Sequence, residues 1–526
     1  MSNKTETFRT DSSKPLNWAL IVGGLTLLAI IVRIPFWNLP VRCDEAAVFL
    51  RYRGGGGWAI LDFLSRYSSP GRHGFHGLTV ALMSLLTGAD FPWVRLPAFA
   101  AGVLSVPLTF IAMRRSVGRA SAAIAALLMA VSHSCVAYSV TARGYTFGIC
   151  LVLITVWYLG KADGRRQGWY PIAAGMALGA AAYTIHTTIY FAVAVAAWYV
   201  WRWLIGTSDR APLVRAGLSF SCSLAITLVV LFLPIMVRGD FGNVVGYRIG
   251  PPLGIADIAV SLPDLFQRVA TRIAGGMQPV AILWLAVVIG AVVTIRQRNK
   301  AGVLMVMALA VIPLVLLLQR VLPPVRTLNF LLPFAYALAG IGIVAAVKTL
   351  QTRCRSLLKI PAHLTASLMG LAMCVALAAA LPSLPSHPIL RPDRDPGLRD
   401  AIHAAARLAG PDEVIFAQSW INALIHYEQW KMGRPANRIV HPRLDVPRAL
   451  LFWPPHWREN DDVVHLLASY RRDKVLFDDG TTQIVRITRI DDNQQAHSST
   501  RPGNNESEPM PELSQETSQL ASLPEE

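Results

Sequence analysis

Long runs of apolar residues, separated by short polar segments, fill the chain as far as residue 381. A helix needs about 20 residues to cross the hydrocarbon core of a bilayer, so each run predicts a transmembrane helix. Several runs are shorter than this and must tilt or borrow flanking residues to span the membrane. We therefore predict eleven spans, at residues 16–33, 95–113, 120–138, 145–160, 170–184, 187–204, 213–235, 279–295, 301–319, 326–347 and 363–381.

The distribution of basic residues between these spans predicts the orientation. With the N-terminus in the cytoplasm, the cytoplasmic segments are 1–15, 114–119, 161–168, 202–215, 296–300 and 348–359. The last five contain sixteen Lys or Arg residues and only two acids, Asp163 and Asp209. Cytoplasmic loops of membrane proteins are enriched in Lys and Arg, so this bias supports the orientation throughout the chain.

Two longer segments then lie outside the cytoplasm. The first is residues 34–94, and its apolar part, "HGFHGLTVALMSLLTG" at 73–88, could be mistaken for a span. Counting it would place the basic loop "RRSVGR" outside and reverse every later loop, so we interpret it as a juxtamembrane helix at the outer interface. The second segment, residues 237–278, contains short amphipathic stretches, including Asp257 to Arg272.

The pattern changes after the last span. Residues 383–490 mix polar and apolar positions, and four stretches are typical of strands: "EVIFA", "RALLFW", "KVLFD" and "TTQIVRITRI". Helical patterns at 396–409 and 420–431, with "DDGT" as a hairpin turn, complete the prediction of a small extracytoplasmic α/β domain. Residues 491–526 have almost no apolar content, so we expect a disordered tail.

The composition narrows the class of protein. The chain is 53% hydrophobic and 15% charged, which excludes an ordinary soluble protein. Its net charge of +17 would suggest nucleic acid in a soluble protein, but the basic residues gather at alternate ends of the apolar runs. The six cysteines form no CxxC pair, so we expect neither a disulfide framework nor a metal cluster.

An acidic pair, Asp44 and Glu45, follows the first span in the stretch "RCDEAAVFLRYR". A carboxylate near the membrane can act as a general base toward an acceptor hydroxyl or amine, or hold a divalent cation. The pair can also be a solvated loop feature, with Asp44 as the N-cap of the helix that follows. Arg51 and Arg53 lie at helical spacing from Asp44 and suit either a phosphate or lipid headgroups.

Three further residues lie at the predicted outer ends of spans. Arg143, beside Tyr145 in "YSVTARGYTF", is an arginine at membrane level, which either binds an anionic ligand or extends to headgroups. His186 in "YTIHTTIYF" can donate to a phosphate or can be a structural histidine in a tight turn. Arg326 opens a late span, where its guanidinium suits a phosphate, with headgroup anchoring as the alternative.

The predicted topology brings five of these residues to the outer membrane interface: Asp44, Glu45, Arg143, His186 and Arg326. A carboxylate base, several cations and access from the lipid suit the transfer of a group from a lipid-linked phosphate donor. The arginines would stabilise the leaving phosphate, and the carboxylate would take the acceptor proton. Possible substrate contacts are Arg51, Tyr145 and His186.

Four stretches, in order and spacing, resemble the GT-C class of integral membrane glycosyltransferases. "CDEAAVFLRYR" is similar to that family's acidic motif in the first outer loop, and "YSVTARGY" to its second outer-loop motif. The block from "SSPGRHGFHG" through "RRSVGR" resembles its juxtamembrane helix and basic cytoplasmic loop, and "RTLNFLLPF" its late arginine-led span. The resemblance covers about residues 16–347 and is to the branch of dolichyl-phosphate-mannose protein mannosyltransferases, lipid A aminoarabinose transferases and lipopolysaccharide-core transferases.

This resemblance implies hexosyl or pentosyl transfer from a polyprenyl-phosphate-linked sugar on the outer face. It implies Asp44 as the catalytic carboxylate with Glu45 beside it, and Arg143 and Arg326 near the donor phosphate. Two features depart from the family pattern. Only Pro70 remains of a His-Pro-Pro motif, and "TARGY" lacks a second Asp that some members carry. Dependence on a divalent cation, Mg²⁺ or Mn²⁺, therefore stays open.

We thus expect a polytopic α-helical membrane protein, with a transmembrane glycosyltransferase domain at 16–382 and an α/β domain at 383–490. The acceptor would be an extracytoplasmic lipid, glycan or protein, and the Ala-rich, basic composition favours the bacterial inner membrane. One alternative is a transporter or flippase of a lipid-linked substrate, which should show interrupted helices and charges near mid-bilayer. Another is a non-catalytic envelope assembly factor, for which Asp44 would be dispensable.

Overall fold

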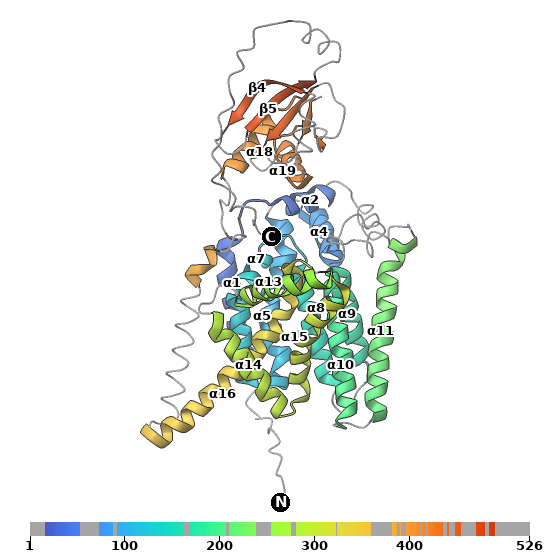
Figure 1. The fold of residues 1–526 in the computed structure, drawn as a ribbon, viewed down its shortest axis with the longest axis vertical. Helices are drawn as coiled ribbons and strands as arrows, with labels where there is room; N and C mark the ends of the chain where they lie inside the picture. Colours follow the sequence, from blue (N-terminus) through green and yellow to red (C-terminus); the bar gives the residue numbers. More distant parts are fainter. Residues whose placement is uncertain are drawn as a thin grey trace, which may run out of the picture. The chain divides into compact units, whose positions relative to one another are not determined.

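The chain divides into two compact units, seen as a ribbon in Figure 1. The membrane unit comprises residues 1–40 and 52–392, and the C-terminal unit comprises residues 41–51 and 393–526. Segment 41–51 thus groups with the C-terminal unit, whereas sequence patterning assigns it to the transmembrane domain. The computed structural model describes residues 16–489 except for 53–72, 88–91, 163–167, 207–209, 238–253, 275–279, 322, 359–380, 387–389, 391–395, 411–412, 417–418, 435–438, 441–447, 454–469 and 479–482.

Helices occupy ten of the eleven predicted spans. They are α1 (Leu16–Arg33), α5 (Leu96–Val117), α6 (Arg119–Val131) with α7 (His133–Ser139), α8 (Tyr145–Ala162), α9 (Tyr170–Thr184), α10 (Tyr190–Leu204), α11 (Arg210–Val237), α14 (Val280–Arg296), α15 (Lys300–Gln319) and α16 (Leu332–Leu358). Nearly all of the eleventh predicted span, 363–381, falls outside the described residues, as does the whole predicted tail.

Fewer helices pass a test of length and apolar composition for membrane crossing than occupy predicted spans. Six helical stretches of the described chain are long and apolar enough to cross a bilayer, and a seventh is added if α6 and α7, which bend by 58° at Ser132, form one span. Helices α9 and α10 have only 15 residues each. The count of eleven spans therefore stays a prediction, which requires these short helices to tilt.

Close helix packing in the membrane unit depends on small residues. A Cβ atom added at Gly290 of α14 would collide with the carbonyl oxygen of Leu338, and one at Gly342 of α16 with that of Ala286. Lipid tails are as apolar as the helices, so helices in membranes associate through close backbone packing of this kind. The two glycines therefore let α14 and α16 lie against each other along their length.

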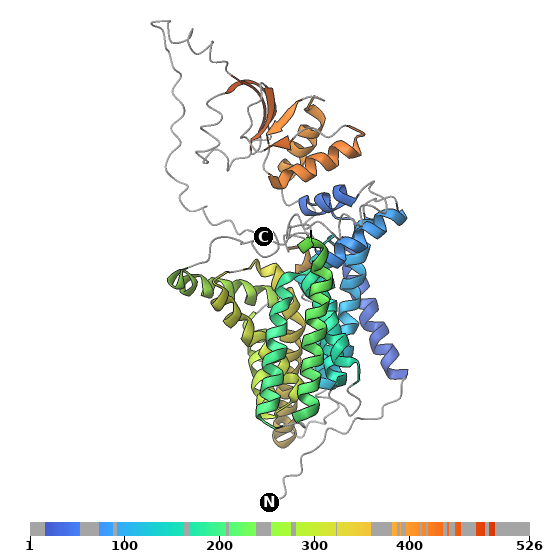
Figure 2. The same ribbon diagram turned by 90° about the vertical axis from the view of Figure 1, so that its right-hand side faces the viewer.

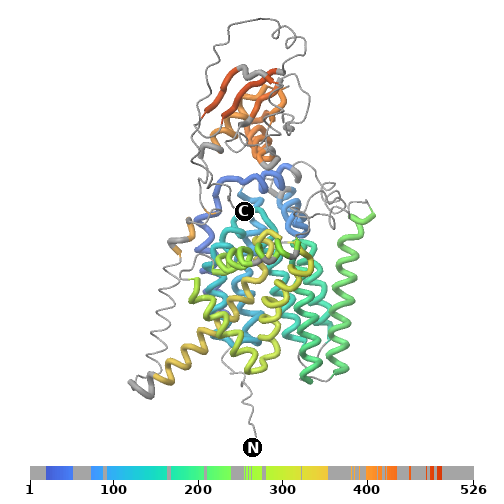
Figure 3. The backbone as a smooth tube through the Cα atoms, in the orientation of Figure 1, coloured from blue at the N-terminus to red at the C-terminus, as the bar shows by residue number. Residues whose placement is uncertain are grey.

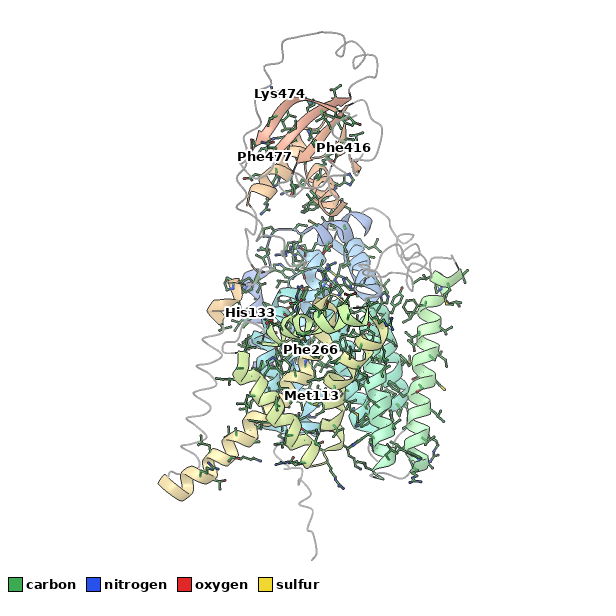
Figure 4. All side chains as sticks on the ribbon, in the orientation of Figure 1. Met113, His133, Phe266, Phe416, Lys474 and Phe477 are labelled. Carbon is green, nitrogen blue, oxygen red and sulfur yellow. The ribbon has the colours of Figure 1, made fainter. Side chains whose placement is uncertain are left out.

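Short elements gather at one end of this bundle, where α7 ends and α8 begins. They are α4 (Gly74–Thr87), η3 (Trp93–Arg95), η4 (His186–Ile189), α13 (Ile255–Ala274) and η5 (Val325–Leu331). Helix α4 is the predicted juxtamembrane helix and is apolar but too short to count as a span. Helix α13 is amphipathic and runs across the long helices (Figures 1 and 3), with Phe266, labelled in Figure 4, on its exposed side.

The C-terminal unit is a five-stranded mixed sheet with helices α2 (Cys43–Tyr52), α18 (Pro396–Leu408) and α19 (Ser419–Lys431). The strand order is β2-β1-β3-β5-β4. Strand β1 (Val414–Phe416) pairs in parallel with β2 (Ile439–Val440) and β3 (Arg448–Trp453). Strand β5 (Gln483–Arg489) pairs antiparallel with β3 and with β4 (Tyr470–Asp478). The short β2 is not among the strands expected from the sequence.

Alternation along the strands separates the two faces of this sheet. Ile415, Leu450 and Ile484 pack with α18 and α19, which lie together on one side of the sheet (Figure 2). Phe416 points to the other face, where its ring meets that of Tyr470 with centroids 5.8 Å apart (Figure 4). The side chains of one strand thus contribute to two separate apolar clusters, as the two-residue period of a strand requires.

Candidate functional site

Helix α2 carries the predicted catalytic pair. It begins at Cys43, so Arg42 occupies the N-cap position, and the Arg42 backbone N–H donates to the Glu45 carboxylate at 3.1 Å. This is the glutamate half of a capping box, in which the third helical residue reaches back to the N-cap. Glu45 is buried, whereas Asp44 is exposed. Glu45 therefore holds the start of the helix, and Asp44, which is not the N-cap, is left facing outward.

The residues around Asp44 explain why this short segment is helical. Two acids in the first turn interact favourably with the positive end of the helix dipole. Ala46 and Phe49 are fully buried and give the helix its apolar face. Arg51 lies in the last turn of α2, and Arg53 lies outside the described residues. Their role in substrate binding stays a prediction.

The segment that leads out of α1 is held by a buried arginine in the membrane unit. Arg95 of η3 is 1% exposed and donates to the backbone carbonyls of Trp37, Leu39 and Pro40, at 3.0, 2.6 and 3.1 Å. Hydrogen bonds from a charged donor each contribute about 1.5–3 kcal/mol. Arg95 thus fixes the backbone immediately before segment 41–51.

Tyr138, at the end of α7, is the centre of a cluster of arginines. Arg272 of α13 donates from Nη2 to the Tyr138 hydroxyl at 2.8 Å and from Nε to the Ser134 hydroxyl at 3.3 Å. Its guanidinium also lies 5.4 Å from the centroid of the Tyr138 ring. The charges of Arg143 and Arg326 act on the same hydroxyl. We call these four residues the Tyr138 cluster.

Different elements place the two other arginines of the Tyr138 cluster. Arg143 lies between α7 and α8, with its guanidinium 5.7 Å from the centroid of the Tyr145 ring, and Tyr145 contacts Tyr138 edge to face at 4.5 Å. Arg326 lies in η5, which is tied to η4 by a hydrogen bond of 2.7 Å from the Thr187 hydroxyl to the Thr327 carbonyl. Three arginines whose charges act on one hydroxyl favour an anion such as a phosphate there.

Two histidines at the start of α4 border this site. His73 and His76 are buried, and none of their four ring nitrogens makes a hydrogen bond of ordinary geometry within the described chain, although the Thr184 backbone lies near His73. The His73 ring contacts the Tyr145 ring at 4.9 Å. Burial, and then the charge of Arg143, lowers the pKa of His76 to about 3, and the same causes lower that of His73. Both imidazoles are therefore neutral hydrogen-bonding groups.

Close packing accommodates His73 beside the loop that carries Arg143. His73 has a positive φ of 44°, which is unusual for a residue other than glycine. A Cβ atom at Gly144 would lie 2.6 Å from the Cβ of His73, so only glycine fits directly after Arg143. The His186 ring, on η4, lies 6.0 Å from that of Phe232, and burial lowers the pKa of His186 to about 4.

The charges of Arg143 and Arg326 both act on Tyr138, and Arg143 lies against the Tyr145 ring. Their role as phosphate ligands stays a prediction. Asp44 and Glu45 belong to the other unit. Sequence reasoning missed Arg272, His73 and His76. Arg272 ends the amphipathic stretch noted in the sequence, but it lies 134 residues from Tyr138, and only the fold joins them.

The described part of the chain was also compared with the ligand sets that divalent cations need. No group of three or more His, Cys, Asp or Glu side chains there could hold a metal ion. The cationic Tyr138 cluster also repels a cation. Dependence on Mg²⁺ or Mn²⁺ therefore stays open.

Comparisons with known proteins give one partial family match and several similar folds. Residues 75–237 match the family model of dolichyl-phosphate-mannose-protein mannosyltransferases, and no curated protein sequence matches the chain. Among solved structures, ArnT from Cupriavidus metallidurans in the apo state shares the fold, with a TM-score of 0.55, 14% identity, and coverage of 90% of this chain and 98% of ArnT. The structure of ArnT bound to undecaprenyl phosphate gives a TM-score of 0.56 at 13% identity, with the same coverage.

A second similar fold is that of the archaeal oligosaccharyltransferase AglB from Archaeoglobus fulgidus, in complex with an inhibitory peptide and a dolichol-phosphate. Its TM-score is 0.51 at 13% identity, and the alignment covers 78% of this chain and 63% of AglB. At such identities the likeness concerns the fold. Residues 75–237 thus match a mannosyltransferase family model, and the chain shares its fold with ArnT and AglB.

Proposed function

We propose that this chain is a membrane glycosyltransferase that moves a sugar from a polyprenyl-phosphate-linked donor to an extracytoplasmic acceptor, which is a lipid, a glycan or a protein. The observation that carries the proposal is the Tyr138 cluster, because Arg272 donates to the Tyr138 hydroxyl and the charges of Arg143 and Arg326 act on the same group. Further support comes from the shared fold with ArnT bound to undecaprenyl phosphate and with AglB in complex with a dolichol-phosphate.

The proposed reaction is a displacement at the anomeric carbon of the donor sugar. An acceptor oxygen or nitrogen forms a bond to that carbon, while the bond from the carbon to the phosphate oxygen breaks. Asp44 takes the proton of the acceptor group. The polyprenyl phosphate leaves with one additional negative charge, which Arg143, Arg272 and Arg326 stabilise. The neutral His73 and His76 offer hydrogen bonds to sugar hydroxyls.

The proposed location follows from the distribution of charge. Basic residues gather in the segments assigned to the cytoplasm, which puts the N-terminus there and the Tyr138 cluster at the outer face. The C-terminal unit is then extracytoplasmic, on the side where the acceptor is used. We place the protein in the bacterial inner membrane on the composition noted above.

The test is the pool of lipid-linked sugars in cells that carry the wild-type chain, Asp44→Asn or Asp400→Asn at matched expression. Asp400 is an exposed acid on α18 of the same unit, so it is a matched control. Loss of a general base slows a reaction about 10²–10⁴-fold. We expect one polyprenyl-phosphate sugar to accumulate with Asp44→Asn only, which also identifies the sugar.

Donor pools that stay at the wild-type level both with Asp44→Asn and with the chain deleted would contradict the proposal. A deletion that traps the donor on the cytoplasmic face, with an Asp44→Asn variant that behaves as wild type, would instead indicate a flippase.

A further inference from the structure

The helix that carries Asp44 packs as a part of the C-terminal unit. Phe49, in the middle of α2, is fully buried, and its ring contacts two aromatic rings of α19. The centroid of Phe49 lies 5.5 Å from that of Tyr427 and 4.8 Å from that of Trp430. Tyr427 and Trp430 also contact each other at 5.8 Å, so the three rings form one cluster, the Phe49 cluster.

This contact fixes the rotation of α2 about its own axis. Asp44 and Phe49 are five positions apart, which places them about 140° apart around a helix of 3.6 residues per turn. Phe49 is buried and Asp44 is exposed, as this geometry requires. The Glu45 cap fixes the start of the helix at the same time. A rotation of α2 about its axis that released Phe49 from its contacts would therefore also move the Asp44 carboxylate.

The partner helix is itself held firmly. Ile421 and Ile425 on the opposite side of α19 are fully buried in the cluster that joins α18 and α19 to the sheet. Glu428 of α19 also pairs with His403 of α18, with Oε2 3.2 Å from Nδ1. The Phe49 cluster thus connects the catalytic carboxylate of the proposed reaction to the core of the sheet through a rigid helix.

We propose that Phe49, Tyr427 and Trp430 are positioning residues, which hold α2 so that Asp44 can take the acceptor proton. This inference rests on the proposed function. It assigns a role to the C-terminal unit: the unit carries the base, whereas the membrane unit carries the arginines for the donor phosphate. A lost ring contact should therefore slow transfer without weakening the binding of the polyprenyl phosphate.

The experiment uses the purified full chain in lipid vesicles. Transfer is followed as consumption of polyprenyl-phosphate sugars extracted from the producing cells, in the presence of an extract of their acceptor-bearing membranes. Donor-side binding is measured with undecaprenyl phosphate. The variants are Phe49→Ala, Phe49→Leu and Trp430→Ala. Tyr470→Ala is the matched control, because it removes one ring of an edge-to-face pair on the other face of the same sheet, away from α2.

We expect kcat to fall by about 10²-fold in Phe49→Ala and Trp430→Ala, because a displacement of about 1 Å at a reacting group has an effect of this size. Phe49→Leu, which still fills the apolar contact, should recover most of the rate. Undecaprenyl phosphate should bind all variants as it binds the wild type. Tyr470→Ala should retain kcat within about threefold, although it lowers the melting temperature of the unit.

Three results would overturn the inference. The first is a Phe49→Ala chain with wild-type kcat. If Asp44→Asn is inactive in the same assay, the proposed function still holds and only the positioning role is lost. An equal loss of kcat in Tyr470→Ala would show that any weakening of the unit has this effect. A fully active Asp44→Asn would remove the base itself, and with it both the inference and the assignment of Asp44 in the proposed function.

Discussion

Arg268 and Arg272 lie one helical turn apart on α13 and have opposite surroundings. Arg268 pairs with Asp264 at 2.9 Å, and both side chains of this pair are more than half exposed. Arg272 reaches inward and donates to the hydroxyls of Tyr138 and Ser134. Exposed ion pairs contribute little to stability, whereas hydrogen bonds from a guanidinium to a phosphate are among the strong ones. The same residue type therefore has two different roles on one helix.

Replacement of each arginine by glutamine tests this difference. Arg272→Gln should weaken the binding of undecaprenyl phosphate about 10- to 100-fold, because one charge-assisted hydrogen bond contributes about 1.5–3 kcal/mol. Arg268→Gln should leave the dissociation constant within about twofold of the wild type. The measurement is equilibrium binding to the purified chain in vesicles. Equal affinities for the two variants would show that the Tyr138 cluster is not the phosphate site.

Candidate site residues could be predicted from the sequence where they belong to a short motif. Arg143, Tyr145 and Arg326 stand out because charged or polar groups interrupt apolar runs, and in the structure Arg143 lies against the Tyr145 ring. Arg272 could not be assigned, because its partner Tyr138 is far away in the sequence and neither residue is unusual in its own segment. His73 and His76 were hidden in an apolar stretch, where only their burial without ordinary hydrogen bonds makes them noticeable.

At the level of elements, the close contact between α14 and α16 depends on the absence of a Cβ atom at glycine positions. Gly290 of α14 has no space for a Cβ atom, because the Leu338 carbonyl occupies that position, whereas Gly160 near the end of α8 has nothing within 4 Å. Both glycines lie in helices and have ordinary helical conformations. They differ in packing and not in backbone freedom.

The pair Gly290→Ala and Gly160→Ala therefore separates packing from helix propensity. Gly160→Ala should be neutral or should stabilise the chain, by up to about 1 kcal/mol, since alanine is the better helix former. Gly290→Ala should force α14 and α16 apart and lower the melting temperature in detergent by several degrees, at about 1–3 kcal/mol for overpacking. Thermal unfolding measured for both variants is the check. A Gly290→Ala chain as stable as Gly160→Ala would show that the two helices do not pack this closely.

Hydrophobic periodicity and run length predicted where the helices lie, but not where they bend or change to a 3₁₀ helix. Apolar runs located the helices in ten of the eleven predicted spans, because burial in lipid requires a continuous apolar stretch. The pattern does not reveal that residues 325–331 form a 3₁₀ helix before α16, or that the chain bends by 58° between α6 and α7. Both features depend on packing against other elements, and a run of apolar letters is the same whether the helix is straight or bent.

At the level of the whole molecule, the residues singled out from the sequence belong to two different units. The arginines belong to the membrane unit, and Asp44 belongs to the C-terminal unit, which the chain reaches through the backbone that Arg95 holds. Sequence patterning assigned residues 41–51 to the transmembrane domain because they adjoin the first span. In the structure this segment packs with the C-terminal unit through the Phe49 cluster, because Phe49 contacts two rings that are almost 400 residues away in the sequence.

The measurement that tests the central claim most directly is the release of polyprenyl phosphate by the purified full chain in vesicles. The vesicles contain labelled polyprenyl-phosphate sugars from the producing cells, together with an extract of their acceptor-bearing membranes. We predict that free polyprenyl phosphate appears as the label moves to an acceptor, and that Asp44→Asn slows both about 10²-fold or more. A donor that stays intact with the wild-type chain, or that only crosses the bilayer unchanged, would contradict the account.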